Sequence, residues 1–263
     1  MNKLIVAGIV RSKPIYKQLH GEAQMWINLD IFRGDLNGKT EKLTLLTRDE
    51  ALMKRVLLSK IQKGDLFITD SAFIESVNYT EDDLWVCPEC GENNTNPHQA
   101  EIANAVFTDY MYAHDFINEA SEIGINEVAL SGRIITEPVM LPTTTSTVSD
   151  FYRCKCKIAC KYYDVIAQEA KICYPFIVFF GKSAQYFMEH AKVGDHINLA
   201  GSFQERQYLK QKKNVVCENC EKTTTSNIWQ TVREIIVQNF DLAAADKMKR
   251  DTSVVSDEED SKN

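Results

Sequence analysis

Apolar residues in this chain gather in short runs separated by polar turns, and this pattern predicts a mainly β protein. In the first half, strands are expected over residues 5–10, 23–32, 42–47, 66–76 and 100–113. In the second half, strands are expected over residues 128–135, 150–160, 174–180, 196–206 and 228–240. A short helix is predicted before the fourth strand of each half. In the second half, its apolar positions are Ala184, Phe187, Met188 and Ala191, at helical spacing.

The two halves of the chain resemble each other in sequence. Residues 3–16 align with residues 127–140 at an offset of 124, which places Gly8 on Gly132 and Pro14 on Pro138. Residues 61–76 align with residues 191–206 at an offset of 130, which places Gly64 on Gly194, Asp65 on Asp195 and Phe73 on Phe203. An internal repeat of this kind predicts a duplicated domain, with six extra residues in the second copy.

The order of the predicted elements indicates the fold class of each copy. Three strands, a helix and a two-strand hairpin form the order of a five-stranded OB barrel. We therefore expect two tandem five-stranded OB-fold barrels, each with a short helix and an extended hairpin between its fourth and fifth strands. The first domain is expected over residues 1–118 and the second over 124–240. Residues 241–263 are expected to form a disordered acidic C-terminal tail.

Charge and composition narrow the function. The formal net charge is −7, but the last thirteen residues hold five acidic residues and one basic residue. The other 250 residues therefore carry a net charge of only −3, so a local basic face remains compatible with the composition. No apolar run reaches eighteen residues, so no membrane partner is expected. The opening MNKLIVAGIVRSK predicts a strand rather than a signal peptide, and we expect a cytoplasmic, nucleoid-associated protein.

Four of the eight cysteines form two Cys-x-x-Cys pairs. Cys87 and Cys90 map onto Cys217 and Cys220 at the same offset of 130 that aligns the fourth strands. Each pair is expected at the tip of the hairpin between the fourth and fifth strands. In a reducing compartment, paired cysteines are more often metal ligands than disulfides. The sequence therefore predicts one four-thiolate Zn²⁺ site, shared by the two copies, that clamps hairpins with little core of their own.

Alternatives remain open for these pairs. Each pair could be completed by a second subunit, or His98 could supplement Cys87 and Cys90. A redox role is less favoured, because redox Cys-x-x-Cys pairs begin helices in βαβ units rather than lying on hairpins. The other cysteines lie in or beside predicted strands and are expected in the core: Cys154, Cys156, Cys160 and Cys173.

The second copy carries motifs that resemble a known family. It begins with Asn-x-Val-x-Leu-x-Gly-Arg (126–133), and its third strand ends in Phe-Gly-Lys (180–182). It continues with Gly-Asp-x-Ile-x-Leu-x-Gly-Ser-Phe-x-x-Arg (194–206). Over most of residues 125–208 the chain thus resembles the bacterial and phage single-stranded DNA-binding protein family. The first copy matches only at its start and at residues 63–76.

The resemblance implies a binding face on the second barrel. The family stacks bases on aromatic residues, which correspond here to Tyr174, Phe180 and Tyr208, and holds phosphates with basic side chains. Independently of the resemblance, basic residues alternate with small apolar ones along the strand expected over 150–160. Aromatic residues share one face of the strand expected over 174–180. The candidates in this copy are Tyr174, Phe176, Phe180, Tyr208, Arg153, Lys155, Lys157, Lys182 and Arg206. The plainer interpretation is that Phe176 and Phe180 belong to the core and that the basic face is merely solvated.

The first copy has no aromatic residue in its third strand, and its candidates are Trp26, Phe32, Tyr79 and Trp85. It could bind DNA more weakly or serve assembly instead. No phosphate loop or nucleophile elbow is present, so we expect no enzyme.

We expect a sequence-tolerant single-stranded DNA-binding protein of replication, recombination or repair. Two chains would form a homodimer with four OB folds, and replication or recombination proteins are possible further partners. The alternatives are a protein–protein interaction module of a replication complex and an RNA-binding OB protein.

Overall fold

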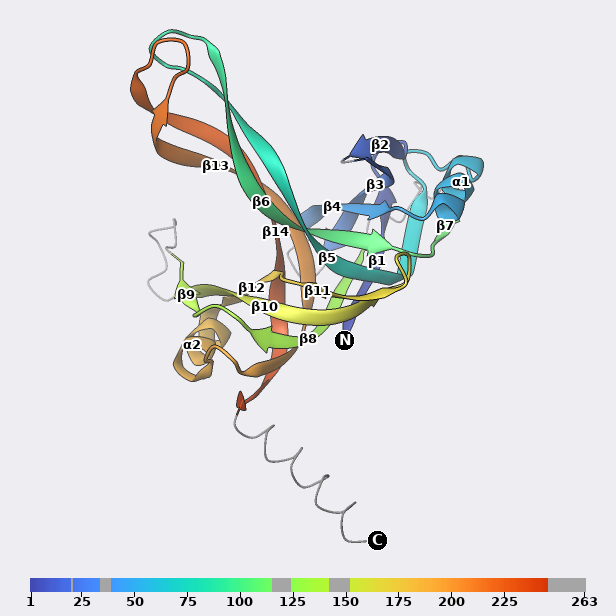
Figure 1. Cartoon of the computed structure of the whole chain (residues 1–263). Helices are drawn as coiled ribbons and strands as arrows, with labels where there is room; N and C mark the ends of the chain where they lie inside the picture. The colour runs from blue at the N-terminus through green and yellow to red at the C-terminus, as the bar shows by residue number, and fades with distance from the viewer. Residues whose placement is uncertain (20, 34–38, 115–123, 142–151, 246–263) are drawn as a thin grey trace, which may run out of the picture.

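The computed structural model describes residues 1–19, 21–33, 39–114, 124–141 and 152–245 (Figure 1). The first half contains β1 (Asn2–Val10), β2 (Ile15–Leu19), β3 (Glu22–Arg33), β4 (Lys39–Thr47), α1 (Glu50–Leu58), β5 (Leu66–Val86), β6 (Asn93–Phe107) and β7 (Met111–Ala113). The second half contains β8 (Ile125–Ile134), β9 (Val139–Met140), β10 (Arg153–Asp164), β11 (Glu169–Cys173), β12 (Phe176–Phe180), α2 (Gly181–His190), β13 (His196–Val216) and β14 (Thr223–Ala243). No helix in the described part of the chain is long and apolar enough to cross a membrane.

Each half closes into a ring of five strands. In barrel 1, β1 pairs with β3, β3 with β4, β4 with β6, β6 with β5, and β5 again with β1. In barrel 2, the same circuit runs through β8, β10, β12, β14 and β13. The β4–β6 and β12–β14 pairs are parallel, and the other pairs are antiparallel. The mainly β architecture agrees with the predicted OB fold.

The two barrels join through β1 and β8, which pair antiparallel across the middle of one continuous sheet. Leu4 lies opposite Val128, which is the residue that the sequence repeat aligns with Leu4. The Asn2 side chain donates to and accepts from the backbone of Ile74, and Asn126 does the same with Phe203. These paired contacts relate the two halves approximately by a twofold rotation.

Glycine is required where the first strand of each barrel crosses the second. A Cβ on Gly8 would lie 2.8 Å from the carbonyl oxygen of Asp30. A Cβ on Gly132, its repeat partner, would lie 2.6 Å from the sulfur of Cys160. The alignment of these two glycines in the sequence therefore reflects the same close approach of two strands in each barrel.

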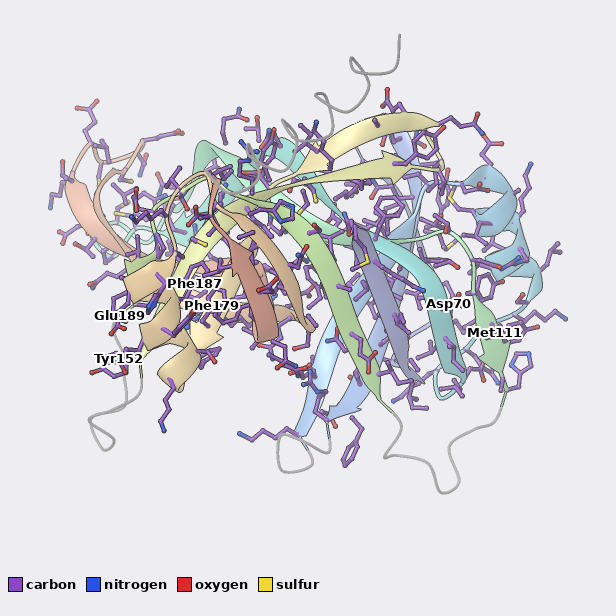
Figure 2. All side chains as sticks on the ribbon, turned by 90° about the horizontal axis from the view of Figure 1, so that it is seen from below. Asp70, Met111, Tyr152, Phe179, Phe187 and Glu189 are labelled. Atoms are coloured by element: carbon purple, nitrogen blue, oxygen red, sulfur yellow. The ribbon has the colours of Figure 1, made fainter. Side chains whose placement is uncertain are left out.

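The core of barrel 2 contains the four cysteines expected there. Cys154, Cys156, Cys160 and Cys173 are all buried, and burial raises the pKa of Cys154 to about 11 and of Cys156 to about 12. Beneath α2, Phe179 stacks on Phe187 with ring centroids 4.0 Å apart (Figure 2).

Several predicted boundaries were wrong. β14 continues to Ala243, so residues 241–243 belong to a barrel strand rather than to the tail. The single strand expected over 100–113 is divided into β6 and β7, and the strand expected over 150–160 runs on to Asp164. The short strands β2, β9 and β11 were not predicted. The remainder of the tail, residues 246–263, and the first domain's expected end at residue 118 lie outside the described residues.

Candidate functional site

Two long hairpins leave the barrels and end together (Figure 1). β5 and β6 form one hairpin, and β13 and β14 form the other. Cys87 and Cys90 lie in the turn between β5 and β6, and Cys217 and Cys220 lie in the turn between β13 and β14. Residues separated by 133 and 127 positions are thereby brought into contact at the tips.

The four sulfur atoms lie within 4.8 Å of one another. The sulfur of Cys87 is 3.8 Å from that of Cys220, and the sulfur of Cys90 is 3.6 Å from that of Cys217. A tetrahedral Zn²⁺ with bonds of about 2.3 Å to sulfur separates its ligand atoms by about 3.8 Å. The donor set and its spacing therefore fit a tetrahedral thiolate-bound metal ion. Of the described residues, no histidine joins this cluster, and the side chain of His98 lies outside the described part.

The backbone of each turn repeats the same geometry. The N–H of Gly91 donates to the carbonyl of Cys87, and the N–H of Glu221 donates to the carbonyl of Cys217, each at 2.9 Å. Gly91 has a φ of +77° and Glu221 has a φ of +56°. Glycine adopts this left-handed conformation freely, whereas for other L-residues it costs about 1–2 kcal/mol. The second turn thus carries strain that the first turn avoids.

We expect Glu221→Gly to raise the stability of the hairpin tip by about 0.5–1 kcal/mol. The relief of left-handed strain is partly offset by the greater freedom of glycine in the unfolded chain. Thermal unfolding of the metal-free protein measures the effect. Glu218→Gly is the matched control, because Glu218 lies in the same turn without a positive φ. Equal shifts from both variants would contradict the strain argument.

The thiols of this cluster influence one another. Hydrogen bonds from the backbone of Cys220 and Asn219, and from neighbouring thiols, lower the pKa of Cys217 to about 6. For Cys220, a backbone hydrogen bond from Lys222 acts in the lowering direction, but desolvation and the neighbouring thiols raise its pKa to about 11. Four adjacent thiolates repel one another, so a bound cation is needed for all four to ionise.

Trp85 packs beneath the cysteine cluster. It is only 4% exposed and contacts Cys87, Val215 and Cys217 in a small apolar cluster. The prediction of Trp85 as a DNA-stacking residue is therefore wrong in this structure. This aromatic residue, two positions before the Cys-x-x-Cys, thus supplies core to the hairpin tips.

One outer face of barrel 2 combines cationic and aromatic side chains. On β10, Arg153 lies opposite Phe180 of β12, and Lys157 lies opposite Phe176. Directly opposite residues in an antiparallel pair project to the same face. The Arg153 guanidinium lies 5.5 Å from the centroid of the Phe180 ring, while Lys155 and Lys157 lie 5.0 Å and 4.8 Å from that of Phe176. Cation–π contacts of this kind hold both groups in place.

Phe176 and Phe180 are half-buried, in contrast to their neighbours in β12. Ile177 and Phe179 are fully buried and point into the barrel core. Phe176 and Phe180 therefore belong to the outer face rather than to the core, and the plainer interpretation of these two residues does not hold. We call the surface formed by Arg153, Lys155, Lys157, Phe176 and Phe180 the cationic–aromatic face.

This face extends across β14 onto β13. Glu234 of β14 is 3% exposed at its side chain and accepts hydrogen bonds from Arg153 at 3.1 Å and from Arg206 at 2.8 Å. The Arg206 guanidinium lies 5.7 Å from the centroid of the Tyr208 ring. One buried carboxylate thus positions two guanidinium groups while neutralising only one charge. Arg206 and Tyr208 therefore lie beside the cationic–aromatic face.

The remaining candidates of the second copy lie at the borders of this face. Tyr174 is 38% exposed and precedes β12, and its N–H donates to the Ser76 hydroxyl of barrel 1 at 2.7 Å. Lys182 is exposed in the first turn of α2. Tyr174 therefore lies where the two barrels meet, a position that the sequence did not indicate.

Barrel 1 presents a different surface at the equivalent strands. Trp26 and Phe32 of β3 are half-buried, and the side chain of Tyr79 lies outside the described part. Trp26 of β3 lies opposite Leu46 of β4. The equivalent pair in barrel 2 is Lys155 of β10 opposite Val178 of β12, so Trp26 takes the position of Lys155. Among the candidates of the first copy whose side chains the structure describes, Trp26 lines a cavity of about 440 Å³.

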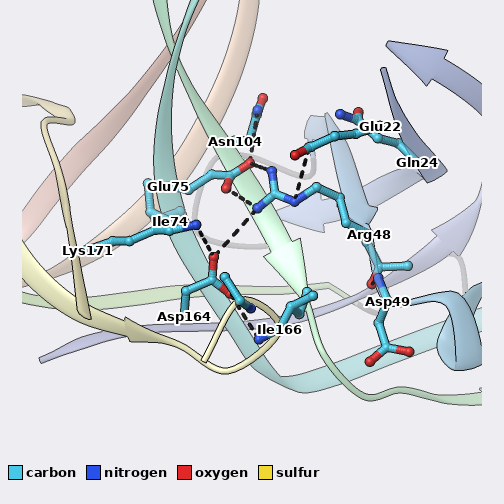
Figure 3. A network of polar contacts seen from close by, with 12 residues as sticks. Glu22, Gln24, Arg48, Asp49, Ile74, Glu75, Asn104, Asp164, Ile166 and Lys171 are labelled. Atoms are coloured by element: carbon cyan, nitrogen blue, oxygen red, sulfur yellow. Dashed lines mark hydrogen bonds and ion pairs between the residues drawn. The ribbon is translucent and has the colours of Figure 1, made fainter. Parts of the chain in front are cut away.

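Arg48, which lines the same cavity as Trp26, belongs to a polar network that was not anticipated from the sequence (Figure 3). Arg48 binds both carboxylate oxygens of Glu75 and lies 3.9 Å from carboxylate oxygens of Glu22 and Asp164. Lys171 donates to Asp164 at 2.9 Å. Burial acts to raise the pKa of Asp164, but hydrogen bonds from Lys171 and from backbone amides lower it overall.

This network fixes a hairpin of barrel 2 against barrel 1. Asp164 and Lys171 belong to the β10–β11 hairpin, whereas Arg48 and Glu75 belong to barrel 1. In the same hairpin, Tyr162 packs on Phe73 with ring centroids 5.1 Å apart. The bidentate pair with Glu75 lies within barrel 1 and orients the Arg48 guanidinium, whose contact with Asp164 at 3.9 Å is the link to barrel 2.

Comparison with known proteins identifies the fold. No protein-family model matches the chain, and no curated protein sequence matches it. Among solved structures, the wild-type single-stranded DNA binding protein from Thermus aquaticus matches with a TM-score of 0.56 at 12% identity, over 93% of each chain. A deletion mutant of the same protein matches with a TM-score of 0.57 at 11% identity, over 93% of this chain and 95% of that chain. The chain therefore shares its overall fold with these proteins, across both of its barrels.

Proposed function

We propose that this protein binds single-stranded DNA on the cationic–aromatic face of barrel 2, without sequence preference and without catalysing a reaction. The observation that carries the proposal is the pairing of Arg153 with Phe180, and of Lys157 with Phe176, across two neighbouring strands. The fold shared with the single-stranded DNA binding protein from Thermus aquaticus supports it.

The chemistry of this face suits a flexible single strand. Every base has a flat aromatic surface, so stacking on Phe176 and Phe180 favours binding by about 1–3 kcal/mol per base whatever its identity. Arg153, Lys155 and Lys157 lie beside these rings, within reach of the phosphates that connect stacked bases. Each phosphate contact releases counterions, so affinity falls as salt rises.

Salt dependence tests the phosphate contacts directly. We expect the affinity for oligo-dT to fall with rising NaCl, and Lys155→Ala to reduce the slope of log K against log salt by about 0.7, the value for one contact to a single strand. The measurement is fluorescence anisotropy of a labelled oligonucleotide at several salt concentrations. Lys54→Ala, on the exposed face of α1, is the control and should leave the slope unchanged. An unchanged slope for Lys155→Ala would remove this lysine from the interface.

We also propose that Cys87, Cys90, Cys217 and Cys220 bind one Zn²⁺ that joins the two hairpins. The sulfur separations of 3.6 Å and 3.8 Å support a tetrahedral ion. The hairpins run well beyond the barrels, and among the described residues the apolar cluster at their tips contains Trp85, Cys87, Val215 and Cys217, with Cys220 packed against it. A metal ion bound by ligands from both hairpins would contribute folding energy where this small core is insufficient.

The wider biological setting follows as an extension of the proposal. Two tandem OB barrels in one chain, derived from a duplicated domain, would form a homodimer with four OB folds. The protein would protect single strands in replication, recombination or repair, within the cytoplasm at the nucleoid. Its acidic tail or its barrels would bind replication or recombination proteins there.

A further inference from the structure

The cysteine cluster at the hairpin tips combines two accessible sulfurs with two buried ones. Cys90 is exposed and Cys220 is half-buried, whereas Cys87 and Cys217 are only 1% and 0% exposed. An oxidant dissolved in water therefore reaches Cys90 and Cys220 first. Each of these two sulfurs has a buried thiol beside it that can react with it once it is oxidised.

The contacts between accessible and buried sulfurs cross from one hairpin to the other. The Cys90 sulfur lies 3.6 Å from that of Cys217, and the Cys220 sulfur lies 3.8 Å from that of Cys87. The side-chain amide of Asn219 also contacts the Cys90 sulfur across the hairpins, at 3.9 Å. A disulfide bond is about 2.05 Å long, so each pair has to close by less than about 2 Å. Each accessible sulfur thus has a partner on the opposite hairpin within reach of a side-chain movement.

Contacts without sulfur keep the two tips in register. Asn94 of the first hairpin is 5% exposed, and its side-chain oxygen accepts a hydrogen bond from the N–H of Glu218 at 3.0 Å. Its side-chain amide donates to the carbonyl of Glu92 at 2.9 Å, which fixes its orientation. On the surface, Lys222 forms an ion pair with Glu89 of the other hairpin at 3.1 Å. None of these contacts requires a metal ion, so they hold the cysteines adjacent while their sulfurs react.

We propose that the cysteine cluster is a site of two-electron oxidation by hydroperoxides, which converts it into two disulfides between the hairpins, Cys87–Cys220 and Cys90–Cys217. The hairpins then stay joined by covalent bonds after the thiolates have been consumed. This pairing differs from that of redox Cys-x-x-Cys motifs, in which the disulfide forms inside one motif. Oxidation of the four thiols depends neither on DNA binding nor on a bound metal ion.

Each disulfide forms in two steps. The accessible thiolate attacks a peroxide oxygen, which breaks the O–O bond, leaves a sulfenic acid on the sulfur and releases hydroxide. The buried sulfur then attacks the sulfenic sulfur, so that the S–S bond forms, the S–O bond breaks and a second hydroxide leaves. The protons of the two thiols convert both hydroxides to water. Two thiols lose two electrons, and one hydrogen peroxide gains them.

The whole cluster therefore consumes two molecules of hydrogen peroxide per chain. A disulfide sulfur is uncharged and cannot replace a thiolate ligand, so a bound Zn²⁺ would be released. The two new bonds join residues that are 133 and 127 positions apart. Disulfides that close such long loops constrain the unfolded chain strongly, whereas a disulfide inside one turn would leave the hairpins unconnected.

The core of barrel 2 provides an internal control for the access of the oxidant. Cys160 and Cys173 lie directly opposite each other on β10 and β11, and both are 0% exposed. These thiols have a neighbouring thiol but no contact with water. We therefore expect them to stay reduced under conditions that oxidise the cysteine cluster.

Peptide mapping of the full-length protein identifies the pairing. Metal-free protein is prepared anaerobically with a chelator and treated with two equivalents of hydrogen peroxide, and its remaining thiols are alkylated before digestion. Trypsin leaves Cys87 and Cys90 together in residues 64–133, and Cys217 and Cys220 together in residues 214–222. We expect these two peptides to be joined to each other.

A second protease resolves the individual bonds. Cleavage after Glu89 and Glu218 separates the two cysteines of each motif. We expect the Cys87 fragment to be linked to the Cys220 fragment, and the Cys90 fragment to the Cys217 fragment.

Two double variants compare the possible pairs at an equal number of cysteines. Cys90→Ser/Cys217→Ser keeps Cys87 and Cys220 on opposite hairpins, whereas Cys217→Ser/Cys220→Ser keeps Cys87 and Cys90 in one turn. Each variant retains one buried and one more accessible cysteine. We expect peroxide to consume the free thiols of the first variant several-fold faster than those of the second.

Several results would overturn the proposal. Disulfides inside each motif would do so, as would pairing of Cys87 with Cys217, sulfinic or sulfonic acids in place of disulfides, or cysteines that stay reduced. Equal rates in the two double variants would contradict the preference for bonds between the hairpins. Purified protein without zinc would contradict the metal clamp, and failure to bind oligo-dT would reject DNA binding, but neither result changes the outcome of the peptide mapping.

Discussion

Replacing Cys217 with serine is expected to abolish stoichiometric metal binding and to open the tips of both hairpins. A serine hydroxyl stays protonated and cannot replace a thiolate ligand. The site would therefore keep three of its four ligands and lose one of the negative charges that bind the cation. Structural zinc sites contribute about 10–16 kcal/mol of apparent binding free energy, so most of the clamp between the hairpins would be lost. Elemental analysis of anaerobically purified protein gives the metal content, and hydrogen exchange reports opening of the segments around residues 85–94 and 215–224.

A cysteine in the core of barrel 2 provides a matched control for the Cys217→Ser experiment. Cys156 is 2% exposed in the barrel 2 core, far from the cysteine cluster in the sheet. Cys156→Ala should lower the global stability by creating a cavity, while leaving metal content and hairpin protection unchanged. Wild-type protein that contains no metal after anaerobic purification would contradict the clamp, as would full metal content in Cys217→Ser.

Removing both rings of the cationic–aromatic face is expected to weaken binding of oligo-dT by about 2–6 kcal/mol, because each stacked base contributes about 1–3 kcal/mol. This corresponds to a loss of about 30-fold to 10⁴-fold in affinity. The variant is Phe176→Ala/Phe180→Ala, and the measurement is a titration followed by anisotropy. Both rings are half-buried on the outer face, so their removal should leave the barrel core intact.

Tyr186→Ala is the control for this double variant. Tyr186 is 52% exposed on α2, where its ring stacks on that of His190 with centroids 4.2 Å apart, and it is not among the residues that form the cationic–aromatic face. Its removal should leave the affinity for oligo-dT unchanged. Equal losses in the two variants, or no loss in the double variant, would contradict the assignment of this face as the binding surface.

The five strands that close each barrel, and the helix of each half, could be predicted because each one is visible in local sequence. The apolar runs predict the strands, and the Gly-Asp turns recur where Asp65 and Asp195 accept hydrogen bonds from the backbone three residues earlier. The cysteine cluster could be predicted because its register is fixed by the repeat, although its members are more than 120 residues apart. The periodicity of apolar residues and the spacing of cysteines are therefore sufficient to predict structure where both halves of the chain use the same local geometry.

The contacts between the barrels could not be predicted in this way. The Arg48–Asp164 contact joins residues that have no equivalent partners in the repeat, and it depends on how the β10–β11 hairpin lies on barrel 1. Trp85 was misassigned because an aromatic residue in a strand can face solvent or core, and only the paired hairpins decide which. The cavity beside Trp26 likewise forms only when β14 passes barrel 1.

The most direct test of the central claim is equilibrium binding of oligo-dT, compared with duplex DNA and with RNA of equal length under the same salt. Anisotropy of labelled ligands gives the three affinities, and the intrinsic fluorescence of the protein gives an independent signal. The account predicts tight, salt-sensitive binding of the DNA single strand and much weaker binding of the duplex. Preference for the RNA strand would indicate an RNA-binding OB protein instead. Failure to bind any of the three would contradict the account and favour a protein–protein interaction module organised by its cysteine cluster.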